Sequence, residues 1–289
     1  MPIKDSELIL NPDGSIYHLN LRPEHLADTI ITVGDPDRVQ SVTKHFDTIE
    51  FTTKKREFHT QTGTYKGKRL TVISTGIGTD NIDIVFNELD ALVNIDFNTR
   101  EIKKELTTLK IIRIGTSGSI QEAIPIDAFL ISEYAAGFDS LLHFYKSEHI
   151  QHLDISKALV QQTNWFNKKS EPYVVTCDSD LFQQLNSSQT VKGFTATNVG
   201  FYGPQGRVLR LPIQDHALND KLASFDYKGM AITNLEMETA GIYGIAKLLG
   251  HKALSMNAII ANRATGEFSP DPKAVVDNLI IYTLNKLIA

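Results

Sequence analysis

The chain has 289 residues, with 29 Lys and Arg against 34 Asp and Glu, so its formal net charge is −5 at pH 7. This balance argues against a strongly basic nucleic-acid binder, and we expect no nucleic acid and no membrane among its partners. Hydrophobic residues make up 42% of the chain, which is ordinary for a globular protein, and no run of about 18 apolar residues occurs. Cys177 has no second cysteine to pair with, and residues 1–20 resemble neither a signal peptide nor a transit peptide. We therefore expect a cytoplasmic protein.

Short β-rich runs alternate with helical patterns along the chain, which predicts a single α/β domain over residues 1–289. The predicted strands are rich in branched apolar residues and cover 29–33, 70–74, 111–114, 129–132, 173–176 and 254–261. The predicted helices have apolar residues at helical spacing and cover 82–93, 238–249 and 274–287. Residues 94–110 are polar and predict a surface helix or insertion.

Three predicted strands run directly into glycine turns, which begin at Gly34, Gly76 and Gly115. In open α/β sheets, ligands bind beyond the carboxyl ends of the strands. Glycine lets the backbone approach a ligand closely, and free N–H groups in such turns bind anions. Residues 76–81 lack the third glycine of a dinucleotide-binding fingerprint, so the turns predict an anion site instead.

Two arginines stand beside these turns. Arg38 follows Gly34 by four residues, and it either binds the same anion as the turn or is a surface residue after an Asp-Pro turn. Arg113 interrupts an apolar strand, where an unpaired charge is costly. It therefore pairs either with a structural carboxylate or with a ligand anion.

Two further motifs lie in the second half of the chain. Glu236 and Glu238 flank a methionine before a very apolar segment, and they are either helix N-terminal acids or acceptors for the hydroxyls of a sugar. Gln205 and Arg207 offer an amide and a planar fork of donors, which can match the polar edge of a flat heterocycle.

As an ordered set, these motifs resemble one family. The matching runs are 33–38 (VGDPDR), 111–118 (IIRIGTSG), 201–207 (FYGPQGR) and 234–238 (NLEME), and the similarity extends from Tyr17 to Arg263. The chain resembles the nucleoside phosphorylases, most closely the uridine phosphorylases. The resemblance implies a single-domain α/β fold with a central mixed β-sheet or distorted barrel flanked by helices.

The resemblance also implies a role for each matching residue. Phosphate would be bound by Gly34, Arg38, Arg113 and Thr116, with Arg56 from a neighbouring subunit. The ribose would be held by Glu236, Met237 and Glu238, with His18 from a neighbouring subunit. The base would be bound by Thr116, Ser117, Gly118, Phe201, Gln205, Arg207, Ile260 and Arg263. The catalytic residues would be Arg38, Arg113, Arg207 and Glu238.

The implied reaction is phosphorolysis of uridine to uracil and ribose 1-phosphate, with inorganic phosphate as co-substrate and no required cofactor. Purine-specific relatives typically have an aspartate at the position of Asn262 or Arg263, so its absence here favours a pyrimidine. The alternatives are a purine nucleoside phosphorylase, a nucleoside hydrolase of the same fold, and a non-catalytic nucleoside-binding protein.

The resemblance further implies a homo-oligomer, because His18 and Arg56 would act across a subunit boundary. The sequence does not choose between a dimer and a hexamer. In bacterial relatives a monovalent-cation site lies at the subunit interface. Glu57 and Ile77 match that site, but Asn81 replaces a serine, so the sequence leaves K⁺ binding open.

Overall fold

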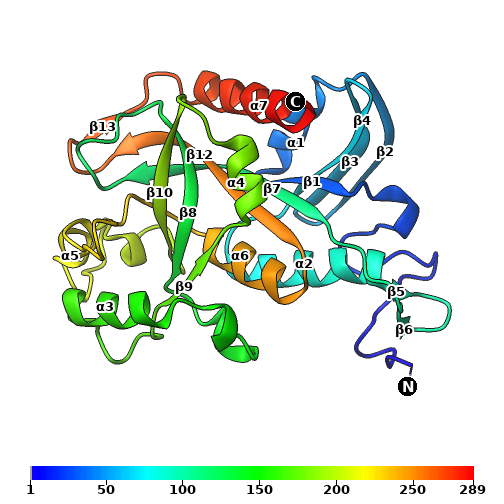
Figure 1. The fold of residues 1–289 in the computed structure, drawn as a ribbon, viewed down its shortest axis with the longest axis horizontal. Helices are drawn as coiled ribbons and strands as arrows, with labels where there is room; N and C mark the ends of the chain where they lie inside the picture. The colour runs from blue at the N-terminus through cyan, green and yellow to red at the C-terminus, as the bar shows by residue number, and fades with distance from the viewer. Residues whose placement is uncertain (1) are drawn as a thin grey trace.

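The computed structural model describes residues 2–289, and eleven strands in it form one mixed sheet (Figure 1). The strands of this sheet are β1 (Thr29–Val33), β2 (Thr48–Lys55), β3 (Phe58–Tyr65), β4 (Lys68–Ser74), β7 (Lys110–Ser119), β8 (Phe129–Gly137), β9 (Tyr173–Thr176), β10 (Thr190–Thr197), β11 (Asn234–Glu236), β12 (Lys252–Asn262) and β13 (Glu267–Phe268). The six strands that the sequence predicts are confirmed, and β4, β7, β8 and β12 are longer than predicted.

Five of these strands close into a barrel. They pair in the order β7, β11, β10, β8 and β12, and β12 then pairs in parallel with β7 again. Strands β1, β4, β3 and β2 extend the sheet from β7, outside the ring. The predicted mixed sheet with a distorted barrel is therefore confirmed.

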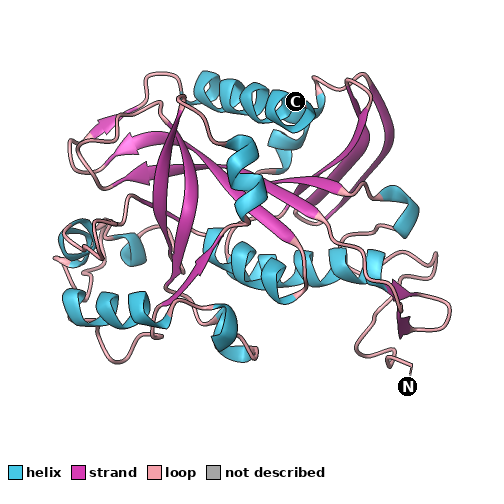
Figure 2. Cartoon of the chain, in the orientation of Figure 1, coloured by secondary structure: helices cyan, strands magenta, loops and turns pink. Residues whose placement is uncertain are grey.

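Helices cover both sides of the strands (Figure 2). They are α1 (Pro36–Thr43), α2 (Thr79–Asn94), α3 (Leu153–Thr163), α4 (Ser179–Leu185), α5 (Leu218–Ala223), α6 (Thr239–Leu248) and α7 (Pro272–Ile288). Helices α2 and α6 pack against each other on one side, and α7 packs with α1 and α4 on the other (Figure 1). The predicted apolar stripe of α2 is buried at Ile82, Val85, Phe86 and Leu89, and each such side chain contributes about 1.5–3 kcal/mol.

Two predicted local structures differ from those observed. Of the surface helix or insertion expected for residues 94–110, the helix is not present after α2 ends at Asn94, and β5 (Ile95–Asp96) and β6 (Glu101–Ile102) instead form a small surface hairpin. The segment lies on the surface, as expected, but it has no apolar stripe that a helix could bury. The run 115–118 is not a turn either, because β7 continues through it while pairing with β12.

Among residues 2–289, none of the helices combines the length and the apolar composition needed to cross a membrane.

Candidate active site

A cleft of about 690 Å³ brings together most of the predicted site residues. This volume is in the range of small-molecule sites. The predicted residues that line it are Gly34, Arg38, Arg113, Thr116, Ser117, Gly118, Phe201, Gln205, Arg207, Glu236, Met237, Glu238 and Ile260. They come from strands, turns and loops that are up to 226 positions apart in the sequence (260 − 34).

Arg113 lies at the buried end of the cleft and is 5% exposed. Its Nη2 atom is 2.6 Å from Glu238 Oε2 and 3.2 Å from Glu236 Oε2, and its Nη1 donates to Asn257 Oδ1 over 2.9 Å. Burial alone would lower the pKa of Arg113, but the two carboxylates raise it, so the guanidinium is charged. Arg113 therefore both pairs with structural carboxylates and lines the cleft, which combines the two alternatives left by the sequence.

Glu236 and Glu238 have different environments. Glu236 accepts hydrogen bonds from the backbone N–H groups of Glu238 and Thr239 at the start of α6, and from Thr197 Oγ1 over 2.6 Å. It is thus a helix N-terminal acid, and the helix dipole favours its charge. Among residues 2–289, the Glu238 carboxylate accepts only from Arg113 and from the Gly78 N–H, over 2.8 Å, and burial raises its pKa. Glu238 has oxygen lone pairs left for a ligand hydroxyl.

Arg38 and the turn at Gly34 form the second cationic wall of the cleft. Asp35 begins α1 by accepting from the Asp37 N–H, and Pro36 occupies its first turn. This places Arg38 on the first turn of the helix, where its Nη1 contacts the Ile114 carbonyl over 3.4 Å. Burial, and then the charge of Arg113, lower the pKa of Arg38. Two neighbouring guanidinium groups and a helix N-terminus suit an anion such as phosphate.

The opposite end of the cleft is formed by the loop of residues 199–207. Arg207 lies over the Phe201 ring, 3.7 Å from its centroid, and its Nη1 donates to Gln205 Oε1 over 2.5 Å. Arg263 supports this loop from behind by donating to the Gln205 carbonyl over 2.6 Å. Burial, and then the charge of Arg263, lower the pKa of Arg207 to about 10, so it stays a cation at neutral pH. Arg207 Nε and Nη2 have no acceptor among residues 2–289 and remain available to a ligand.

Comparisons with known proteins agree with this arrangement. Residues 28–281 match the family model of the phosphorylase superfamily. The chain belongs to this superfamily. A uridine phosphorylase of Thermococcus kodakarensis is 29% identical over 265 residues, covering 89% of this chain and 80% of the relative. A DeoD-type purine nucleoside phosphorylase of Shewanella loihica is 27% identical over 281 residues, covering 94% and 98%.

A solved structure shares the fold over nearly its whole length. The Trypanosoma brucei nucleoside phosphorylase, which shows uridine phosphorylase activity, superimposes with a TM-score of 0.88 at 29% identity, covering 98% of this chain and 99% of that chain. The present chain is thus an enzyme of the nucleoside phosphorylase type, with a nucleoside and phosphate as substrates. Because uridine and purine relatives have nearly equal identity, the base is inferred below from the residues of the cleft.

Three predicted residues of this phosphorylase do not line the cleft: His18, Arg56 and Arg263. His18 Nδ1 is 2.6 Å from Glu88 Oε1, and Arg56 is exposed in the turn between β2 and β3, 5.8 Å from the Tyr17 ring centroid. Arg56 is therefore exposed at the surface of the chain, whereas His18 is half-buried. Arg263 contacts the loop 199–207 by donating to the Gln205 carbonyl.

The cation ligands implied by the resemblance, Glu57, Ile77 and Asn81, also line the cleft. Asn81 Nδ2 donates to the Ile77 carbonyl over 3.3 Å, so an N–H group faces the oxygen that a cation would need.

The lining residues that were not among the predicted site residues include Asp35, Pro36, Leu235, Ala261 and Phe268. Phe268 lies on the two-residue strand β13 and is 63% exposed at the cleft. An aromatic residue five positions after Arg263 was the available signal, but a strand this short has no detectable period.

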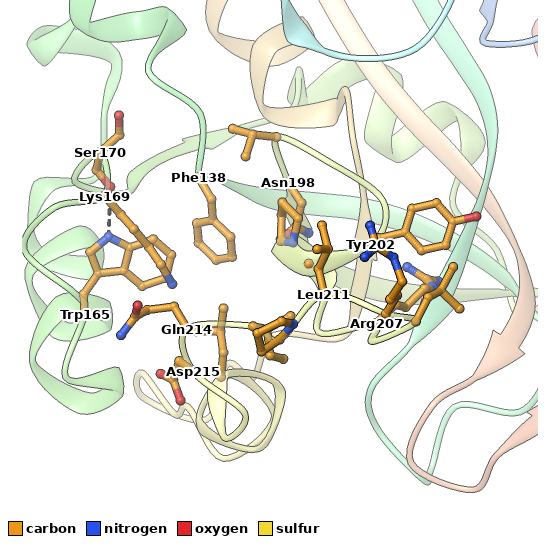
Figure 3. A pocket seen from close by; sticks show the side chains of 18 residues that line it. Phe138, Trp165, Lys169, Ser170, Asn198, Tyr202, Arg207, Leu211, Gln214 and Asp215 are labelled. Carbon is orange, nitrogen blue, oxygen red and sulfur yellow. Dashed lines mark hydrogen bonds between the residues drawn. The ribbon is translucent and has the colours of Figure 1, made fainter.

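A second cavity, of about 780 Å³, lies on the other side of the loop 199–207. Its lining is mostly apolar, with Phe138, Trp165 and Leu211 around it and Arg207 and Tyr202 at one end (Figure 3). It lacks the pair of buried carboxylates and the glycine turn that distinguish the cleft.

Proposed function

We propose that this phosphorylase converts uridine and phosphate to uracil and ribose 1-phosphate. The observation that carries the proposal is the chemistry of the base end, where Gln205 and Arg207 present hydrogen-bonding groups and no carboxyl group is present. The carboxylates that border the cleft are Asp35, Glu57, Glu236 and Glu238, which belong to the phosphate and sugar end or to its rim. A departing uracil becomes an anion with two carbonyl oxygens, and it needs donors rather than an acid.

Asn262 supports the same assignment. Its Nδ2 donates to the carbonyls of Gln121 and Ile124, and its Oδ1 accepts from the N–H groups of Ala264 and Thr265. Asn262 therefore braces its own hairpin and does not line the cleft. A purine leaving group would find no proton donor of carboxylic acid type at this position.

The proposed reaction proceeds in a single displacement. A phosphate oxygen, held by Arg38 and Arg113, attacks the anomeric carbon of the ribose while the bond from that carbon to the base nitrogen breaks. The bonding electron pair goes to the base, and Arg207 stabilises the resulting anion, which later takes a proton from water. Glu238 accepts hydrogen bonds from ribose hydroxyls and so holds the sugar as it becomes positively charged. The reaction needs no covalent enzyme intermediate.

A nucleoside hydrolase would instead need a carboxylate free to activate water. Glu238 is bound to Arg113 and to the Gly78 N–H, and two arginines form the wall where that water would stand. This arrangement favours phosphate as the attacking group.

The test is release of free base from uridine and from inosine, each with and without phosphate. We expect uracil release that requires phosphate, with inosine unreactive. Phosphate-independent release would indicate a hydrolase, and reaction of inosine alone would reject the assignment of Gln205 and Arg207 to uracil. Binding of both substrates without turnover would indicate a nucleoside-binding protein.

We also propose that the enzyme is a homo-oligomer in which Arg56 and His18 complete the neighbour's site. We expect Arg56→Ala and Arg113→Ala proteins to be nearly inactive separately, and their co-expressed mixture to recover about a quarter of wild-type turnover if the chains pair at random as dimers. The control mixture combines Arg38→Ala with Arg113→Ala, two changes within one site, and should stay inactive. Failure of the first mixture to recover activity would place Arg56 in its own subunit's site, and full activity of Arg56→Ala alone would place Arg56 outside catalysis.

A further inference from the structure

Six buried polar side chains form one continuous chain of hydrogen bonds inside the barrel. All five barrel strands contribute, and each side chain is at most 6% exposed. The members, which we call the barrel chain, are Arg113 and Ser117 from β7, Asn257 from β12, Ser132 from β8, Thr195 from β10 and Asn234 from β11. Its two ends, Arg113 and Ser117, both line the cleft.

The chemistry of Arg113 decides the direction of the first bonds. A guanidinium group can only donate, so the Asn257 atom that faces it over 2.9 Å is the amide oxygen. The Asn257 amide nitrogen then donates to Ser132 Oγ over 3.2 Å, with a longer contact to Ser255. The Ser132 proton has one acceptor among residues 2–289, Thr195 Oγ1 at 2.6 Å, so Ser132 donates to it.

The directions of the remaining hydrogen bonds follow in the same way, from which atom can donate and which can accept. Thr195 passes its own proton to Asn234 Oδ1 over 2.9 Å, and Asn234 Nδ2 donates to Ser117 Oγ over 2.9 Å. Ser117 Oγ is thereby an acceptor, and its own hydroxyl proton has no acceptor among residues 2–289. Every bond points from Arg113 toward Ser117, and the last donor faces the cleft.

We propose that Asn257 and Asn234 are positioning residues, which hold the Arg113 guanidinium toward phosphate and aim the Ser117 hydroxyl as a donor to the base. The inference rests on the proposed function, since it takes phosphate and a base as the ligands at the two ends. Neither asparagine lines the cleft, so each acts through the residue that it holds.

The two ends of the barrel chain, Arg113 and Ser117, are held in different ways. Arg113 is pulled toward Glu236 and Glu238 through Nη2, and Asn257 provides the opposing contact on Nη1. Without that contact the guanidinium is free to turn further onto the carboxylates, away from an incoming phosphate. At the other end, the hydroxyl proton of Ser117 can point in three staggered directions. Because Ser117 Oγ accepts the bond from Asn234, the directions in which the proton faces the ligand are favoured.

Three variants separate these roles. Asn257→Leu removes both halves of the amide, and we expect it to raise the KM for phosphate roughly 10-fold or more while changing the KM for nucleoside much less. Asn257→Asp keeps an oxygen toward Arg113, and we expect it to restore the phosphate KM to within a few-fold of wild type. Thr195→Val is nearly isosteric and breaks the chain in the middle, and we expect it to raise the nucleoside KM several-fold with little change in the phosphate KM.

The control is Asn94→Leu, a change at another buried asparagine that caps the loop after α2, far from the cleft. It should lower thermal stability without changing either KM. If Asn257→Leu does not fold, Asn257→Asp and Thr195→Val still test the two ends.

The outcomes distinguish this inference from the proposed function. The wild-type assay comes first, and base release without phosphate dependence would reject the proposed function. With phosphate dependence established, on whichever nucleoside reacts, unchanged KM values in the Asn257 and Thr195 variants would overturn the positioning roles. Equal shifts of both KM values in every variant would also overturn them, since these would indicate a purely structural chain.

Discussion

Replacing Arg207 by alanine is expected to lower uridine turnover by roughly 100- to 1,000-fold, the range for removal of one donor from an oxyanion site. In the proposed reaction, the negative charge of the departing uracil develops next to the Nε and Nη2 groups of Arg207, which have no acceptor among residues 2–289. The interaction is stronger in the transition state than with neutral uridine, so kcat falls more than the KM for uridine rises. Steady-state kinetics with uridine and saturating phosphate measures both terms.

The matched control for this change is Arg210→Ala, three residues further along the same loop. Arg210 borders the second cavity rather than the cleft and is exposed, so its removal should leave turnover near wild type. Arg207→Lys should fall between wild type and Arg207→Ala, because lysine keeps the charge but loses the planar fork that lies over Phe201. Wild-type turnover in Arg207→Ala, with an unchanged circular dichroism spectrum, would remove Arg207 from the base site.

The sequence predicts the buried strands and the turns at the cleft well, because one local pattern indicates both. A strand such as 29–33 is apolar because both of its faces are covered, and it ends at Gly34 because the backbone must then turn toward the ligand. The same local pattern therefore indicates both the strand and the site at its end. The resemblance of the ordered runs to the nucleoside phosphorylases implied the residue roles, which remain predictions.

Long-range pairing could not be predicted from local patterns. Strand β3 has threonines at every second position, and β2 combines threonines with charged residues and is largely exposed, so no apolar run indicates either strand. Closure of the barrel depends on β12 pairing with β7, which residues 120–251 separate along the chain, and this long-range pairing has no local pattern. The sequence also could not show that Arg113 pairs with Glu236 and Glu238, because these carboxylates approach it only in the folded chain.

Residues 115–118 were wrongly predicted to be a glycine turn, and the glycine at position 115 has a different physical reason. Gly115 lies inside β7, directly opposite Asn257 in the register with β12. A Cβ atom built on Gly115 would be 1.9 Å from Arg113 Nη1 and 2.3 Å from its Cζ, far inside van der Waals contact. Glycine is therefore needed here so that the Arg113 guanidinium can fold back against its own strand, not so that the chain can turn.

Gly115→Ala is consequently expected to displace the Arg113 guanidinium and to lower kcat/KM for phosphate by roughly 10- to 100-fold, the equivalent of losing one or more hydrogen bonds to a charged group. The same overpacking should cost about 1–3 kcal/mol of stability, which thermal unfolding measures separately. Gly193→Ala is the matched control, since its Cβ would be 2.3 Å from Leu130 Cδ2 on the neighbouring strand and would disturb only apolar packing. Gly193→Ala should thus lose stability while its phosphate KM stays near wild type. If both variants change the phosphate KM by the same factor, loss of barrel packing rather than displacement of Arg113 explains the effect, and Gly115 has no special relation to phosphate binding.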